Sequence, residues 1–131
     1  MEATSAELAA VPLFAPLSEP ELAEIAAWFD AKDVGNGVRL VGEGASGYTF
    51  FVLAAGSAVV TANGEEVRAL GDGDFFGEIA ILGDGRRSAT VTTTAPSRLL
   101  VMFGTEFRRL QQEYPAIASQ IEATMGARVA H

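Results

Sequence analysis

Hydrophobic residues recur with a helical period near the N-terminus of the chain. Residues Ala3 to Ala10 favour a short helix, and a longer amphipathic helix is predicted over Glu19 to Ala31. The apolar stripe of that second helix consists of Leu22, Ile25, Ala26 and Phe29. Ser18 and Glu21 stand just where a capping box begins a helix, because each side chain can bond to the other's backbone N–H. The pattern therefore predicts N-terminal helices over about 3–31.

The period changes between Val34 and Met102, where short Val-, Phe-, Leu- and Thr-rich segments alternate with glycines. The clearest candidate strands are Tyr48–Leu53, Ser57–Thr61, Glu66–Leu70, Ala89–Thr93 and Ser97–Met102. Asn63 and Gly64 separate two of them, and this pair is typical of a tight type I′ hairpin turn. Many short strands with regular turn glycines favour a sandwich, a jelly roll or a small barrel, here over about 34–103.

Helical spacing returns after Met102. Glu106 to Tyr114 predicts a short helix with Thr105 as its N-cap, and Pro115 is well suited to open a second helix. One narrow stripe of that last helix consists of Ile117, Ile121, Met125 and Val129. The predicted fold is therefore mainly β with flanking α: N-terminal helices, a β-roll, and a C-terminal helix pair over about 105–130.

Composition narrows the possible functions. A length of 131 residues favours a single domain spanning 1–131. Seventeen acidic and nine basic residues give a net charge of −8. Proteins that bind nucleic acid usually carry an excess of positive charge, so this composition argues against that function. The absence of cysteine excludes disulfides, zinc–thiolate sites and thiol catalysis. Because His131 is the only histidine, the sequence also argues against a multi-histidine metal site and a Ser-His-Asp triad.

The sequence holds no signal-peptide pattern and no apolar run of the roughly 18 residues that a membrane helix needs. We therefore expect no direct membrane insertion. The expected location is the cytoplasm, either for a free protein or for the cytosolic domain of a larger one that itself lies in a membrane.

Candidate chemistry concentrates between Gly73 and Val91, a stretch that is too apolar for a solvated loop yet carries glycines, an acid and an arginine pair. A single helical turn from Gly77 to Leu82 would present free backbone N–H groups to an anion. Arg87 can offer a planar fork to a phosphate, and Glu78 can accept a hydrogen bond from a sugar hydroxyl. These groups suit a ligand with a phosphate and a nearby hydroxyl.

This segment resembles the phosphate-binding cassette of cyclic nucleotide-binding domains, which reads Phe-Gly-Glu, then small or apolar residues, then Arg-x-Ala-Thr. The matching residues are Phe76-Gly77-Glu78-Ile79-Ala80 and Arg87-Ser88-Ala89-Thr90-Val91. Upstream, the stretch from Glu43 to Leu53 resembles the family's Glu-Gly-x-x-Gly-x-x-Phe-Phe-Val motif, and Gly56 fits the glycine that opens the next strand. The resemblance covers about Val11 to His131 and implies a β-roll of about eight strands.

The resemblance also implies residue roles within a cassette at 76–90. Arg87 would pair with the cyclic phosphate, and Glu78 would accept from the ribose 2′-OH. Backbone N–H groups of Ala80 and Ser88 would complete the phosphate cage, while Gly77 allows close approach. Val60 would line the base pocket, and the final helix would act as a lid over the base. The predicted ligand-binding set is Gly77, Glu78, Ile79, Ala80, Arg87, Ser88, Ala89 and Val60.

The function implied is a regulatory sensor that binds cAMP, favoured over cGMP, without catalysis, cofactor or metal. Closure of the C-terminal helix would be its conformational readout. Its output would pass to an effector domain or partner protein outside this chain. Three other interpretations stay open. Glu78 and Arg87 could form an internal ion pair that braces a loop; the fold could be a degenerate interaction or dimerisation scaffold; or it could be a cupin-like enzyme, although such sites usually need two or more histidines.

Overall fold

The computed structural model describes residues 3–41, 49–77 and 89–129, with side chains left undescribed at 41 and beyond 124. Within these residues the chain forms two four-stranded antiparallel sheets. The first sheet has the order β1 (Asp30–Val34), β8 (Ser97–Phe103), β3 (Thr49–Ala55), β6 (Phe75–Phe76). The second has the order β2 (Arg39–Val41), β7 (Thr90–Thr93), β4 (Ala58–Ala62), β5 (Glu65–Leu70).

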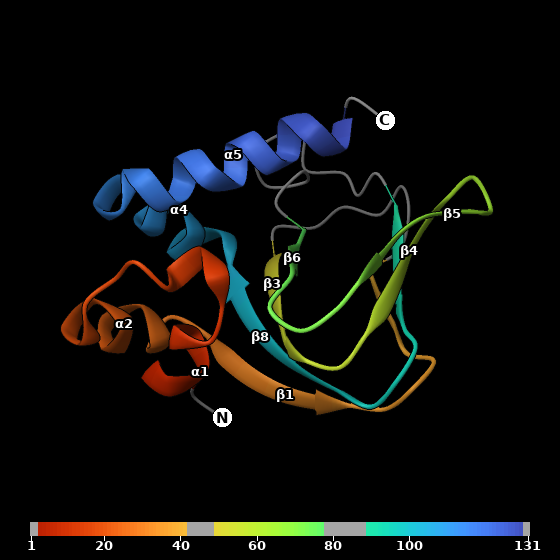
Figure 1. Cartoon of the computed structure of the whole chain (residues 1–131), viewed down its shortest axis with the longest axis horizontal. Coiled ribbons are helices and arrows are strands. Elements are labelled where there is room, and N and C mark those ends of the chain that lie inside the picture. Colours follow the sequence, from red (N-terminus) through yellow and green to blue (C-terminus); the bar gives the residue numbers. More distant parts are fainter. Residues whose placement is uncertain (1–2, 42–48, 78–88, 130–131) are drawn as a thin grey trace.

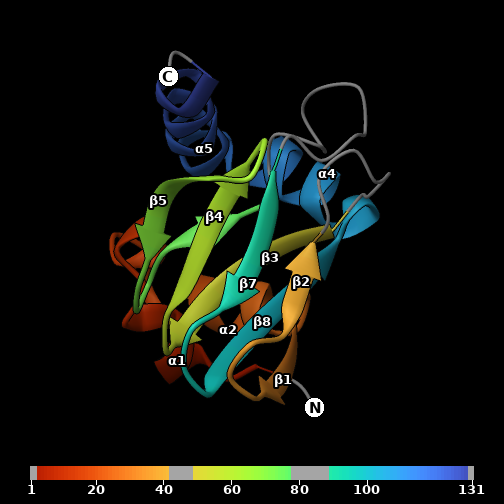
Figure 2. The ribbon, with the colours of Figure 1, turned by 90° about the vertical axis from the view of Figure 1, so that its right-hand side faces the viewer.

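The helices lie beside the first sheet, on the side away from the second sheet, except that the last one runs across one end of the roll (Figures 1 and 2). They are α1 (Ser5–Ala9), the 3₁₀ turn η1 (Pro12–Phe14), α2 (Glu19–Ala26), α4 (Gly104–Glu113) and α5 (Pro115–Val129). The predicted capping box of Ser18 and Glu21 is present at the start of α2. A second capping box, of Thr4 and Glu7, opens α1 and was not foreseen from the pattern. The predicted class, mainly β with helices at both ends, is confirmed.

Two predicted helix boundaries are wrong. The helix expected to reach Ala31 ends at Ala26, because Asp30 to Val34 pairs with β8 as an edge strand instead. Phe29 still reaches the core, at 2% exposure, but from the turn between α2 and β1. At the other end of the roll, α4 begins at Gly104 with Phe103 at the N-cap and no side-chain cap. Thr105 therefore lies inside the helix, where its hydroxyl donates to Glu106 at 2.7 Å.

The predicted strands and hairpin are present. Each of the five expected segments corresponds to a strand whose ends shift by a residue or two, as strand boundaries commonly do. Asn63 (φ 54°) and Gly64 (φ 79°) join β4 to β5 with the left-handed backbone that a type I′ turn requires.

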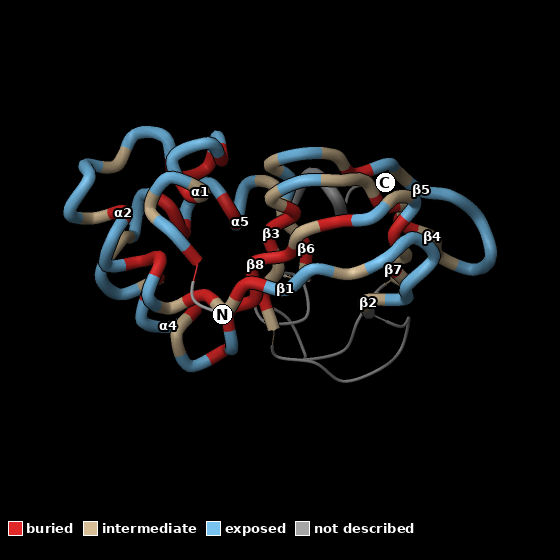
Figure 3. Tube along the Cα trace, turned by 90° about the horizontal axis from the view of Figure 1, so that it is seen from below, coloured by how far each residue is buried: buried red, intermediate tan, exposed pale blue. Residues whose placement is uncertain are grey.

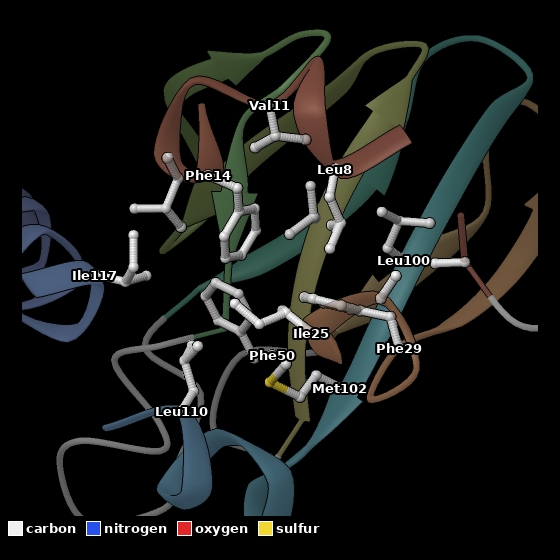
Figure 4. Close-up of a cluster of buried hydrophobic side chains, with 14 of the residues drawn as sticks. Leu8, Val11, Phe14, Ile25, Phe29, Phe50, Leu100, Met102, Leu110 and Ile117 are labelled. Atoms are coloured by element: carbon white, nitrogen blue, oxygen red, sulfur yellow. The ribbon is translucent and has the colours of Figure 1, made fainter. Parts of the chain in front are cut away.

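The first sheet is buried on both faces. Because successive side chains of a strand point to opposite faces, Phe50 and Val52 of β3 face the helices, whereas Leu53 faces the second sheet. We call the first group the helix-side core; its largest fully buried members are Leu8, Val11, Phe14, Ile25, Phe50, Leu100, Met102, Phe107, Leu110 and Ile121 (Figures 3 and 4). We call the second group the interior core; it comprises Leu53, Ala58, Val60, Leu70, Phe76, Val91, Leu99 and Val101.

Aromatic rings dominate the middle of the helix-side core. Phe50 of β3 stacks on Phe107 of α4, with ring centroids 5.0 Å apart and planes 9° apart. Phe14 and Phe29 meet edge to face at 6.0 Å. Phe29 also meets Phe50 at 6.5 Å, so these contacts join the N-terminal turn, the sheet and α4 into one packed layer.

Candidate functional site

The two ends of the predicted cassette are held by different sheets. Before it, Phe76 of β6 pairs with Phe51 of β3 in the first sheet. After it, Val91 of β7 pairs with Val60 of β4 in the second sheet. The cassette therefore leaves one sheet and returns to the other. Five predicted site residues lie outside the described residues: Glu78, Ile79, Ala80, Arg87 and Ser88.

The described members of the predicted site are Val60, Gly77 and Ala89. Val60 points inward as expected and is 8% exposed within the interior core, against which Ala89 also packs. Gly77 directly follows Phe76, whose ring stacks on Phe51 at a centroid distance of 4.8 Å. Gly77 has φ +92°, so the backbone itself favours glycine here. The interior core thus supports both ends of the cassette.

The last helix, α5, passes over one end of the roll (Figures 1 and 2). Ile117 and Ile121 of its apolar stripe are 4% and 0% exposed, and both belong to the helix-side core. The side chains of Met125 and Val129 lie outside those the structure describes. The first half of α5 is therefore packed into the helical layer, against η1 and α4.

A group of side chains that the sequence pattern did not single out fixes the α4–α5 junction to α2. The Tyr114 hydroxyl donates to Glu24 at 2.8 Å, and its ring meets Trp28 edge to face at 6.2 Å. The guanidinium of Arg109 lies 4.7 Å from the centre of the Trp28 ring. Burial, helped by the bond to Glu24, raises the pKa of Tyr114 to about 12. The spacing of residues in the sequence does not predict this junction, because the residues that form it come from separate elements.

Among the described residues, no cluster of three or more His, Cys, Asp or Glu side chains could hold a metal ion. Within the same part of the chain, none of the helices has the length and apolar character needed to cross a membrane.

Comparison with known protein families aligns residues 32–114 with the cyclic nucleotide-binding domain. The chain belongs to this family. The aligned range encloses the candidate cassette and most of the β-roll, so the resemblance noted in the sequence is confirmed at the level of the family. Membership makes this a cyclic nucleotide-binding regulatory domain, of a family whose role is to bind a ligand.

Relatives of this cyclic nucleotide-binding domain belong to longer proteins. A cyclic nucleotide-gated potassium channel from Rhizobium etli is 34% identical over 117 residues, which are 89% of this chain and 33% of the channel. A cAMP-dependent protein kinase regulatory subunit from Hypocrea atroviridis is 31% identical, over 76% of this chain and 22% of its own. A cGMP-dependent protein kinase from Caenorhabditis briggsae is 38% identical, over 68% of this chain and 13% of its own. The chain thus spans a third or less of these relatives.

The fold of the domain matches solved structures of the family. The catabolite activator protein of Thermus thermophilus superposes with a TM-score of 0.80 at 26% identity, covering 91% of this chain and 58% of that one. The pair of antiparallel sheets with flanking helices is therefore the family β-roll.

Proposed function

We propose that this domain is a non-catalytic sensor that binds a 3′,5′-cyclic nucleotide, cAMP in preference to cGMP, with closure of α5 as its conformational readout. The observation that carries the proposal is the family match over residues 32–114, which encloses an unbroken cassette motif. Glu78 and Arg87, the two charged residues of that motif, are both present in the sequence.

In this proposal Arg87 pairs with the cyclic phosphate, and Glu78 accepts from the ribose 2′-OH. The N–H groups of Ala80 and Ser88 complete the phosphate cage beside Gly77. The inward position of Val60 in the interior core supports its contact with the base, because Val60 pairs with Val91 close to where the cassette ends. Ile79 and Ala89 complete the set as apolar neighbours of the charged groups.

The net charge of −8 does not prevent an anionic ligand from binding. Charges farther away than about 8–10 Å are largely screened at physiological salt. An arginine and a phosphate about 4 Å apart attract each other by about 4 kcal/mol at an effective dielectric constant near 20. The local pair therefore outweighs the distant acidic surface, whose main effect is on the rate of association.

Ligand binding acts here by shifting a population between two arrangements of α5. A ligand can favour one arrangement only by the difference between its affinities for the two. The burial of Ile117 and Ile121 supports a movement confined to the half of α5 that follows Ile121. The first half of the helix, held in the helix-side core, then serves as a fixed base for that movement.

The preference for cAMP rests on the lack of a clear guanine reader on the last helix. Gln120 and Thr124 are the polar candidates on α5. The Thr124 hydroxyl already donates to the carbonyl of Gln120 at 3.1 Å, as helical threonines commonly do. Ser88 can contact either the phosphate or a base, so it does not discriminate between the two nucleotides.

The sensor would report to an effector domain or partner protein outside this chain, as the longer channel and kinase relatives suggest. We place it in the cytoplasm, or on the cytosolic side of a larger protein. In neither case would the domain contact nucleic acid or insert into a membrane.

Isothermal titration of the chain with cAMP, cGMP and AMP tests this function. The expected result is binding of both cyclic nucleotides, tighter for cAMP, and much weaker binding of AMP. Arg87→Ala is expected to weaken cAMP binding by roughly 3–5 kcal/mol, because the phosphate then loses its buried partner. Arg86→Ala, at the neighbouring arginine, is the matched control and is expected to leave the affinity nearly unchanged.

Two outcomes would overturn the proposal. One is a wild-type chain that ignores every 3′,5′-cyclic nucleotide at millimolar concentration. The other is a loss of less than tenfold in the Arg87→Ala variant, which would mean that Arg87 does not face the phosphate.

A further inference from the structure

Phe103 is the most exposed large hydrophobic side chain among the described residues. It is 62% exposed, compared with 44% for Val67 and 38% for Val38. It lies at the end of β8, where the first sheet meets α4 (Figure 1). Most of the surface of this aromatic side chain is open to solvent, and aromatic side chains are enriched where proteins meet one another.

Two hollows flank Phe103, one on each side of β8. Because β8 lies between β1 and β3, one hollow opens towards β1 and the other towards β3. The β1-side hollow has a volume of about 410 Å³, and its lining includes Trp28 and Val101. The β3-side hollow is also about 410 Å³, and its lining includes Thr49 and Gly104. Phe103 lines both hollows and forms the ridge between them.

Glu106 lines the β1-side hollow and Arg108 lines the β3-side hollow. The other charged groups of the β1-side hollow have partners of their own: Arg109 pairs with Glu113 at 2.7 Å, and a hydrogen bond with the N-terminal amine is the first cause of the lowered pKa of Asp30. The described lining of the β3-side hollow has a single charged residue, the exposed Arg108. The face therefore presents the Glu106 carboxylate, the aromatic ridge and the Arg108 guanidinium in that order.

This order is self-complementary. A two-fold axis along the ridge places the β1-side hollow of one copy against the β3-side hollow of the other. Glu106 of each copy then faces Arg108 of the other, twice by symmetry, and the two Phe103 rings meet at the axis, where aromatic rings pack well offset from each other. A partner of one charge could satisfy only half of this face, whereas a second copy satisfies all of it.

We propose that the Phe103 face is a self-association surface on which two copies of this chain dock about a two-fold axis. Long-range repulsion between two acidic chains does not prevent this, because it is screened beyond about 8–10 Å at physiological salt. A contact of this size belongs to the weak, transient class of interfaces. The self-association surface contains no residue of the proposed nucleotide site, so nucleotide binding and self-association are tested independently.

Sedimentation equilibrium of the full chain, from micromolar to millimolar concentration, tests this surface. The wild type is expected to show a reversible monomer–dimer equilibrium that weakens as salt is added. Phe103→Ser is expected to raise the dimer dissociation constant on the order of tenfold or more, because it removes the aromatic residue at the centre of the interface. Val67→Ser, which removes another exposed hydrophobic side chain on β5, is the matched control and is expected to change nothing.

A charge swap makes the test independent of the apolar contact. Arg108→Glu alone is expected to weaken the dimer, and adding Glu106→Arg is expected to restore it, with far-UV circular dichroism showing that each variant is folded. The proposal is overturned by a wild type that stays monomeric at millimolar concentration. It is also overturned by equal effects of Phe103→Ser and Val67→Ser, by a double swap that recovers nothing, or by assembly beyond the dimer.

Discussion

Gly56 shows how a single residue type is fixed by its surroundings. It lies between β3 and β4 with φ +112°, and its N–H donates to Asp72 at 2.7 Å. A Cβ at this position would come within 2.7 Å of the Ser97 Cβ and 2.8 Å of the Ser97 Cα. Both the backbone conformation and the closeness of β8 therefore demand glycine, which is a physical reason for the glycine that the family motif has here.

Gly56→Ala is expected to lower the free energy of unfolding by about 2–4 kcal/mol, because backbone strain and overlap with Ser97 add together. Gly64→Ala, in the hairpin, has a positive φ but no atom within 4 Å of the added Cβ. It is expected to cost only about 1 kcal/mol. Urea unfolding of both variants measures the difference, and equal losses would show that the approach of Ser97 has no energetic weight.

At the level of an element, α1 is held to the first sheet by one arginine. Arg98 of β8 donates through Nε to Glu7 of α1 at 2.7 Å and through Nη1 to Asp33 of β1 at 3.2 Å. Glu7 also closes the capping box at Thr4, so one carboxylate both starts the helix and docks it. The hydrogen bond from Arg98 is the largest cause of a pKa of Glu7 below its ordinary value, and burial opposes it.

This lowered pKa of Glu7 makes the docking of α1 sensitive to acid. A carboxyl group with a lower pKa in the folded than in the unfolded chain adds stability above its unfolded pKa and loses it as the pH falls. The contribution of Glu7 is therefore full at neutral pH, begins to fall near the ordinary glutamate pKa of 4.5, and is lost as the pH drops through the lower pKa of the folded state. Glu7→Gln is expected to cost about 1 kcal/mol at neutral pH and to flatten the acid limb of the stability curve.

Urea midpoints of the wild type and Glu7→Gln, measured across the acid range, test this dependence. Glu122→Gln, at an exposed carboxylate of α5, is the control and is expected to follow the wild-type curve. An unchanged slope in Glu7→Gln would show that other groups carry the acid sensitivity.

The elements that the sequence predicted are those with a sustained pattern. Strands β3, β4, β5, β7 and β8 alternate or run apolar over several residues, and α5 begins at a proline. The strands β1, β2 and β6 were missed. β1 reads Asp-Ala-Lys-Asp-Val, a composition that disfavours strands, and it exists because its backbone pairs with β8. The other two have three and two residues, too few for any period to appear.

The candidate site could also be predicted only in part. The inward direction of Val60 was implied by the family resemblance, and the glycine at position 77 suits its positive φ. The roles of Glu78 and Arg87 rest on the motif and stay predictions, because residue types and spacing do not fix where a side chain points. The Tyr114–Glu24 contact was not predictable, since it joins residues 90 positions apart.

At the scale of the whole molecule, the first sheet belongs to both hydrophobic cores. Its strands contribute Leu100 and Met102 to the helix-side core, and Leu99 and Val101 to the interior core. If the first sheet unfolds, both cores lose part of their packing, because each contains side chains from its strands. We therefore expect the helical layer and the β-roll to unfold together.

The single tryptophan provides a test of this cooperativity. Trp28 packs against the helix-side core, so its fluorescence reports on the helical layer, whereas far-UV circular dichroism reports on the whole backbone. The two signals are expected to give coincident urea transitions, as two-state unfolding requires. A tryptophan transition at clearly lower urea would show that the helical layer detaches first.

The alternation along β8 also matters for protein engineering. A library randomised at Leu99 and Val101 changes the interior core between the sheets. A library randomised at Leu100 and Met102 changes the helix-side core, and so the packing of the helices on the first sheet. Neighbouring codons of one strand therefore give separate control over the packing between the two sheets and over the attachment of the helical layer.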